Sequence, residues 1–208
     1  MIALTIAGSD SGGGAGIQAD LKTFAALGVH GVAVITSLTA QNTLAVRDIF
    51  DVPVAFVGAQ FRAIHEDFKI RAAKTGMLSS REIIETVAGE VGSYPLVVDP
   101  VMVAASGGRL LRSDAVEALT EKLFPKAALV TPNLFEAQVL SGLKIRSTGD
   151  MRKAAKKISK LGCSVLVKGG HLNATDILYS NKKKYNPKNS CKQCKDKCGC
   201  QPNNKVKL

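Results

Sequence analysis

The chain has 208 residues, 46% of them hydrophobic, and a formal net charge of +11 at pH 7. This length fits one α/β domain with a sizeable core, and because no apolar run approaches the ~20 residues that span a bilayer, an integral membrane protein is excluded. Nine lysines and one acid lie beyond residue 180, which leaves 19 basic and 16 acidic residues before it, so this body is nearly balanced and is not predicted to bind a polyanion.

Short apolar runs alternate with amphipathic runs along residues 1–180. In chain order, the first predicted elements are a strand at 2–7, a helix at 17–27, a strand at 31–37, a flap strand at 47–51, a helix opened by Pro53 and a strand at 72–77. A helix capped by Ser79 or Ser80 then runs to about residue 91. It is followed by a strand at 96–100, a helix at 113–123, a strand at 128–131, a helix at 134–140, a helix ending at 161 and a strand at 164–168. This rhythm predicts an α/β fold built from parallel βαβ units with right-handed crossovers.

The stretch Gly8–Gly16 joins the first predicted strand to the first predicted helix, and five of its nine residues are glycine. Such a turn lets backbone amides approach a ligand and directs the positive end of a helix toward it. No Lys-Ser/Thr pair follows for a Walker loop, and no Gly-x-Gly-x-x-Gly register fits. The stretch therefore predicts a small-ligand site without identifying the ligand.

Polar residues accompany the carboxyl ends of several predicted strands: Asp10, Gln41, Asp99, Asn133, Glu136 and Lys168. Because strand ends of an open parallel sheet meet at one edge, we expect these residues to surround one crevice. Carboxylates suit magnesium, and a lysine offsets phosphate charge. The set favours a nucleotide phosphate with a divalent cation.

Six stretches, in order, resemble the hydroxymethylpyrimidine and hydroxymethylpyrimidine-phosphate kinases of thiamine biosynthesis, within the ribokinase-like superfamily. They are AGSDSGGGAGIQAD at 7–20, AQNT at 40–43, KTGML at 74–78, DPVM at 99–102, TPNLFEA at 131–137 and KGGH at 168–171. The resemblance covers residues 1 to about 179. It implies a three-layer α/β/α ribokinase-like fold with a mostly parallel central sheet, incomplete at the carboxyl end, over residues 1–180.

The resemblance implies ATP- and Mg²⁺-dependent phosphorylation of 4-amino-5-hydroxymethyl-2-methylpyrimidine and of its monophosphate. In the substrate half, Asp20 would accept a hydrogen bond from the exocyclic amine and Gln41 would bond the ring edge, while Met77 would pack against the ring. On spacing alone, Asp20 fits equally well as an acid near a helix start, where it would favour the helix dipole.

The resemblance assigns the nucleotide half to Asp99, Asn133, Glu136 and Lys168. Asn133 and Glu136 would hold the magnesium-bound phosphates, with Glu136 as the metal ligand and Asp99 supporting the charge network. Lys168 would meet the phosphates as a point charge. From the residues alone, Asn133 and Glu136 also fit a helix cap and its capping-box partner, and Lys168 also fits a solvated lysine at a strand end.

The sequence departs from the family pattern after the last of the six motifs, KGGH at 168–171. Family members continue into further strands and a Gly-Thr-Gly-Cys segment whose amides stabilise the moving phosphoryl group, and no such segment follows here. The stretch Ser147–Asp150 is no substitute, because it precedes the strand ending at Lys168 and forms a Ser-x-x-Asp helix start. The catalytic residues therefore stay unassigned, and we expect poor substrate binding and little kinase activity from this chain alone.

Cysteine usage also divides the chain. Cys163 is the one cysteine before residue 181, which is typical of a reduced compartment, and no leader-like series opens the chain, so we expect a cytoplasmic protein. The tail cysteines are Cys191, Cys194, Cys198 and Cys200. Four thiolates are enough for a zinc site, but Cys198 and Cys200 are close together and the surrounding lysines contribute no hydrophobic core. Residues 181–208 are therefore predicted to be a disordered basic tail. A changed reading frame after Asn181 would produce such a tail.

Several functional alternatives remain open at this point. One is a noncatalytic binder of pyrimidine or nucleotide, because the anion-hole segment is missing. Another is a pyridoxal kinase, which would share the nucleotide half, although Gln41 and Met77 favour the pyrimidine. A nucleic-acid partner is disfavoured because the lysine tail carries no interleaved aromatic residues beyond Tyr185. A homodimer is compatible with the sequence.

Overall fold

The computed structural model describes residues 1–102, 113–170 and 174–180, which form one eight-stranded sheet in the order β3-β2-β1-β4-β5-β6-β7-β8. The strands are β1 (Ile2–Asp10), β2 (His30–Gln41), β3 (Val46–Asp51), β4 (Ala72–Thr75), β5 (Leu96–Val98), β6 (Leu129–Val130), β7 (Ser164–Val167) and β8 (Ile177–Tyr179). The helices are α1 (Gly16–Ala26), α2 (Val54–Asp67), α3 (Arg81–Glu90), α4 (Ser113–Ala118), α5 (Leu134–Ser141) and α6 (Thr148–Ile158), with single-turn helices η1 (Leu119–Leu123), η2 (Phe124–Lys126) and η3 (Ser159–Leu161).

The central strands are parallel, and the two edge strands are not. β2, β1, β4, β5, β6 and β7 pair in parallel, while β3 is antiparallel to β2 and β8 is antiparallel to β7. The expectation of a mostly parallel α/β sheet is therefore confirmed. The carboxyl ends of the central strands share one edge of the sheet, as the sequence predicts.

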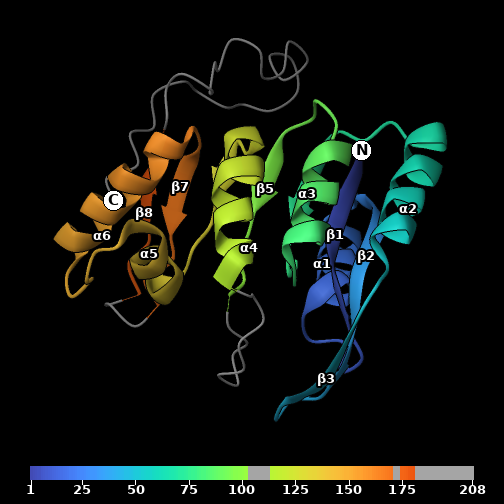
Figure 1. Ribbon diagram of the computed structural model, residues 1–208, viewed down its shortest axis with the longest axis horizontal. Helices are drawn as coiled ribbons and strands as arrows, with labels where there is room; N and C mark the ends of the chain where they lie inside the picture. Colours follow the sequence, from blue (N-terminus) through green and yellow to red (C-terminus); the bar gives the residue numbers. More distant parts are fainter. Residues whose placement is uncertain (103–112, 171–173, 181–208) are drawn as a thin grey trace.

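Helices cover the two faces of the sheet unequally (Figure 1). α2 to α6 lie over one face, where fully buried residues such as Leu4, Ile6 and Phe61 belong to the core. Within the described part of the chain, α1 is the one helix on the opposite face, and it packs on β1 and β2. Over β5 to β8 that opposite face carries apolar side chains that are partly or largely exposed: Val97, Leu129, Leu166 and Leu178.

Two strands extend beyond their predicted ends. The sequence predicts ends at residues 7 and 37, but β1 continues to Asp10 and β2 to Gln41. The reason is tertiary pairing: β3 folds back antiparallel on β2 from Ser37 to Gln41, and Ser9 and Asp10 pair with the extended β2 in turn. Backbone hydrogen bonds from neighbouring strands thus keep a polar, glycine-containing segment extended, which local periodicity does not reveal.

Other boundaries also differ from the sequence-based ones. The helix predicted at 113–123 is α-helical only to Ala118 and continues as the π-helical turn η1. The strand β8 has no counterpart among the predicted elements. The residue His171 of the KGGH stretch and the tail at 181–208, with its cysteines, lie outside the described residues.

Candidate functional site

A cavity of about 340 Å³ opens at the carboxyl ends of β1, β2, β4 and β5. Four of the seven predicted site residues line it: Asp20, Gln41, Met77 and Asp99. They come from α1, the end of β2, the loop after β4 and the loop after β5, so segments far apart in the sequence meet here. We call this cavity the sheet-edge pocket. Of the six strand-exit residues expected to surround one crevice, Asp10, Gln41 and Asp99 line this pocket, whereas Asn133, Glu136 and Lys168 are not among its lining residues.

The glycine-rich stretch is organised by Asp10, which is 5% exposed and lines the pocket. Its carboxylate accepts hydrogen bonds from the backbone N–H groups of Gly12 at 2.7 Å, Gly14 at 2.9 Å and Ala15 at 2.8 Å. These amides are therefore occupied by the protein's own carboxylate. The expectation that the stretch presents its amides to a ligand does not hold for these three.

Asp20 is held by two neighbours that the sequence analysis did not identify. The hydroxyl of Thr5, on β1, donates to Oδ2 at 2.6 Å, and the ammonium of Lys74, on β4, donates to Oδ1 and Oδ2 at 2.8 Å each. No acidic residue lies in the first turn of α1, so the alternative that Asp20 serves the helix dipole is wrong. Lys74 belongs to the KTGML stretch, and that motif was the available signal.

Gln41 and Met77 both contact the glycine-rich stretch. The N–H of Gln41 donates to Ser11 Oγ at 2.8 Å, and its carbonyl accepts from the same hydroxyl at 2.7 Å. The side-chain amide is hydrogen-bonded to Thr39 Oγ1 at 3.1 Å. Met77 is 8% exposed, and a Cβ placed on Gly8 would lie 3.0 Å from its methyl carbon, so its side chain packs across Gly8. The side-chain amide of Gln41 and the apolar thioether of Met77 thus line the same pocket.

Lys168 is not among the residues that line the pocket, but its ammonium lies 3.0 Å from Asp99 Oδ1, and Asp99 does line it. The side chain of Lys168 is also 42% exposed, so it is both paired with Asp99 and solvated, as the alternative of a lysine at a strand end expects. The backbone of Lys168 pairs with Asn133, and its N–H donates to the Pro132 carbonyl at 2.8 Å. The predicted nucleotide residues Asp99, Lys168 and Asn133 thus form a connected group that continues from the pocket along the sheet edge.

Asn133 and Glu136 form a capping box at the start of α5. Asn133 Oδ1 accepts from the Glu136 N–H at 2.9 Å, and Glu136 Oε2 accepts from the Asn133 N–H at 2.8 Å. Glu136 Oε1 accepts from the Met102 N–H at 3.2 Å, and Glu136 is 3% exposed. Burial raises the pKa of the Glu136 carboxyl, against the lowering effect of these backbone hydrogen bonds. The helix-cap interpretation is therefore confirmed.

The carboxylates present fit a magnesium ion that is held mainly by phosphates and water. Among the described residues, no group of three or more His, Cys, Asp or Glu side chains could hold a metal. Magnesium is commonly bound through only one or two carboxylates together with substrate phosphates. Asp99, whose side chain is 24% exposed, is the accessible carboxylate, whereas both Glu136 oxygens already accept backbone hydrogen bonds. Glu136 as the metal ligand stays a prediction.

The capping box leads to a stability prediction. Replacing Asn133 with Ala removes the acceptor of the Glu136 N–H, so we expect the free energy of unfolding to fall by about 0.5–2 kcal/mol in urea denaturation. Asn133→Ser keeps a capping oxygen and is the matched control, with a smaller expected loss. Equal losses in the two variants would show that the cap contributes no measurable stability.

A second cavity, of about 420 Å³, lies between α6 and β8. It is lined by Arg152, Lys153, Lys156 and residues 176–179, and none of the predicted site residues is among them. The sheet-edge pocket is therefore the better candidate site, because only there do the predicted polar groups converge. Over the same described ranges, no helix has the length and apolar character needed to cross a bilayer.

Comparisons with known proteins show which family this chain resembles. A family model described as phosphomethylpyrimidine kinase matches residues 10–200. The chain is 53% identical over 185 residues to the hydroxymethylpyrimidine/phosphomethylpyrimidine kinase of Rhizobium meliloti, covering 86% of this chain and 70% of that protein. It is 52% identical over 183 residues to the thiamine biosynthesis bifunctional protein ThiED of Geobacter sulfurreducens, covering 85% of this chain and 37% of that protein.

Solved structures share the fold. The phosphomethylpyrimidine kinase of Clostridium difficile superimposes with a TM-score of 0.81 at 48% identity, covering 87% of this chain and 81% of that one. The pyridoxal kinase of Bacillus subtilis, solved as an ADP complex, gives a TM-score of 0.78 at 42% identity, covering 86% of this chain and 71% of that one. Both comparisons support the ribokinase-like α/β architecture.

Proposed function

The chain belongs to the phosphomethylpyrimidine kinase family, and we propose that it transfers the γ-phosphate of ATP to 4-amino-5-hydroxymethyl-2-methylpyrimidine and to its monophosphate in thiamine biosynthesis. The observation that carries the proposal is the convergence of Asp20, Gln41, Met77 and Asp99 on one pocket, with Lys168 bonded to Asp99. The reaction would take place in the cytoplasm, as the sequence indicates.

In the substrate half, the proposed roles follow from the groups that line the pocket. The carboxylate of Asp20 accepts a hydrogen bond from the exocyclic amine of the pyrimidine. The Gln41 amide offers both a donor and an acceptor to the ring edge, and Met77 packs against the ring face. These roles are supported by the joint presence of the three side chains around a cavity of about 340 Å³, which is the size of a small-molecule site.

In the nucleotide half, Lys168 and Asn133 would contact the phosphates of ATP, and Glu136 would hold the magnesium ion together with Asp99, while its capping box supports Asn133. When bound, the ion neutralises charge on the transferring phosphoryl group. The existing ion pair at 3.0 Å supports this arrangement, because it holds Lys168 beside Asp99, which lines the pocket. The protein's contribution is to position phosphates and to offset their charge.

The proposal is tested by measuring ADP formation and pyrimidine binding with the purified 208-residue chain. We expect weak calorimetric binding of the pyrimidine and of its monophosphate, and slow ADP release that requires both Mg²⁺ and a pyrimidine, because the anion-hole segment is missing. Binding without ADP release would instead support a noncatalytic binder. Repeating both measurements after removal of residues 181–208 shows what the tail contributes. If neither the full chain nor the shortened chain binds a pyrimidine, the proposal is contradicted.

A second candidate is a pyridoxal kinase, because the Bacillus subtilis pyridoxal kinase shares the fold at 42% identity. The two candidates differ in the polar pattern that the substrate presents to Asp20 and Gln41. A competition measurement separates them: we expect the pyrimidine to displace pyridoxal, and tighter binding of pyridoxal would favour the alternative.

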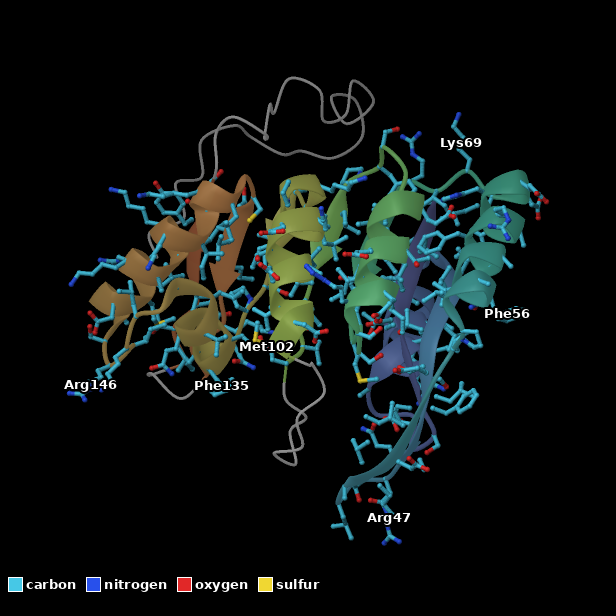
Figure 2. All side chains as sticks on the ribbon, in the orientation of Figure 1. Arg47, Phe56, Lys69, Met102, Phe135 and Arg146 are labelled. Atoms are coloured by element: carbon cyan, nitrogen blue, oxygen red, sulfur yellow. The ribbon has the colours of Figure 1, made fainter. Side chains whose placement is uncertain are left out.

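We also propose that the chain forms a homodimer through the β2–β3 ribbon, which projects from the body with Arg47 near its tip (Figure 2). Leu38 and Phe50 lie directly opposite each other on β2 and β3, and they are 46% and 66% exposed. Leu44 is 80% exposed. Exposed apolar side chains grouped on one ribbon are typical of a surface that another protein covers.

The dimer leads to a prediction at this ribbon. Phe50→Ser removes apolar contact area, so we expect a larger share of monomer at micromolar concentration in light scattering coupled to size-exclusion chromatography. Phe56→Ser, at a side chain of α2 that is also 61% exposed, is the matched control and should leave the mass unchanged. A monomeric unmodified chain would contradict the homodimer.

A further inference from the structure

Three carboxylates line the sheet-edge pocket, and each has its own partner. Asp10 accepts hydrogen bonds from three backbone amides of the loop that follows it. Asp99 is paired with Lys168 at 3.0 Å, and Asp20 is paired with Lys74 at 2.8 Å. Asp99 lies in the proposed nucleotide half and Asp20 in the proposed substrate half. The charge of Asp20 is therefore offset by Lys74, to which the family resemblance assigns no role.

The geometry makes Lys74 part of the pocket wall as well as a partner of Asp20. Lys74 lines the pocket, and its side chain is 27% exposed against 16% for Asp20. It lies beside Thr5 in the parallel register of β1 and β4, so these two side chains project from the same face of the sheet toward Asp20 on α1. Among the described residues that line the pocket, Lys74 is the one lysine or arginine.

The ammonium of Lys74 has three N–H donors, and Asp20 takes two of them, one through each carboxylate oxygen. One donor is left for a group in the pocket. Thr5 and Lys74 together use both lone pairs of Asp20 Oδ2 and one of Oδ1. This leaves Asp20 one acceptor position on Oδ1, and the pair therefore presents one acceptor and one donor, with no net charge, at the pocket wall.

The two proposed substrates differ mainly in charge. The hydroxymethyl compound is neutral, whereas a phosphate monoester carries about −1.5 to −2 at pH 7. Both must enter the same cavity of about 340 Å³. Without Lys74, the Asp20 carboxylate would repel the monophosphate inside this cavity, because charges in a partly desolvated cavity interact more strongly than in water. Compensation of Asp20 therefore matters for the second substrate and much less for the first.

Resting on the function proposed above, we propose that Lys74 is a specificity-determining residue that admits the monophosphate to the pocket. It offsets the charge of Asp20, which then offers a hydrogen-bond acceptor to the aminopyrimidine without excluding an anionic substituent. Asp20 thus recognises the ring common to both substrates, and Lys74 extends that recognition to the phosphorylated one.

The test compares binding of the pyrimidine and of its monophosphate, measured by calorimetry at one fixed ionic strength. Lys74→Met keeps the length of the side chain but removes the charge, and we expect the ratio of the two dissociation constants to move about tenfold against the monophosphate. Lys74→Arg keeps the charge and should restore most of the ratio. Lys22→Met is the matched control, because Lys22 also lies on this side of the molecule but bonds the Gly13 carbonyl at 2.8 Å and does not line the pocket.

The outcomes separate this inference from the function on which it rests. If the unmodified chain binds neither compound, the proposed function fails, and the role of Lys74 fails with it. If the unmodified chain binds both and Lys74→Met weakens both equally, Lys74 only supports the local structure and the inference is overturned. The ratio of two dissociation constants is insensitive to the fraction of unfolded protein, so a destabilised variant still gives a decisive result.

Discussion

Asp20→Asn is expected to weaken pyrimidine binding by about a hundredfold while leaving the chain folded. The substitution replaces a charged acceptor by a neutral amide, and hydrogen bonds to a charged group contribute about 1.5–3 kcal/mol. It also leaves Lys74 without its carboxylate, since both of the present contacts at 2.8 Å depend on it. Calorimetric titration of the folded variant with the hydroxymethylpyrimidine measures the loss directly.

A matched carboxylate separates the loss at Asp20 from a general effect of charge. Asp67 is exposed at the end of α2, which packs on the opposite face of the sheet from α1. Asp67→Asn makes the same chemical change there and should leave binding within about twofold of the unmodified chain. If Asp20→Asn binds the pyrimidine as tightly as Asp67→Asn does, the ring is not held by Asp20 and the substrate half of the proposal is wrong.

Gly16→Ala is expected to cost at least about 3 kcal/mol of folding stability and to abolish binding at the sheet-edge pocket. Gly16 has φ +58°, where an L-residue is disfavoured by about 1–2 kcal/mol. In addition, a Cβ at this position would lie 2.2 Å from the Gly8 carbonyl oxygen, a backbone atom of β1. Relief of that contact must displace the glycine-rich stretch from Asp10, and it therefore disrupts the pocket as well as the fold.

Gly28 offers the control for this second prediction. It also has a positive φ, +68°, but a Cβ there would meet nothing within 4 Å. Gly28→Ala therefore incurs only the conformational cost, about 1–2 kcal/mol, and should leave the pocket intact. Urea denaturation and pyrimidine binding of the two variants separate the cost of backbone conformation from that of the steric contact. Similar losses in both would contradict the importance of the Gly8–Gly16 approach.

Most of the elements and part of the site follow from local sequence. Apolar runs, amphipathic periodicity and capping residues identify all strands of the sheet except β8, and they place Asp10, Gln41 and Asp99 near one sheet edge. Asp20 and Met77 are expected at the site only from the family resemblance, and the structure brings them to the same pocket. The cap formed by Asn133 and Glu136 was available from spacing because its partners lie three residues apart. Interactions of this kind depend on neighbours in the chain.

The two ion pairs of the site could not be predicted from neighbouring residues in the chain. Asp20 and Lys74 are separated by 54 residues, Asp99 and Lys168 by 69, and each contact exists only because of the order of the strands and their register. The same holds for Asp10, whose carboxylate occupies amides that composition alone leaves open to a ligand.

Local patterns therefore account for where strands and helices form and for which residues reach the sheet edge, since each depends on side chains a few positions apart. The tertiary structure decides which acidic side chain pairs with which basic one, and which backbone amides remain free to bind a ligand. Those contacts arise from sheet order and register, and burial gives them their strength, because a polar group removed from water must find its partner across the fold.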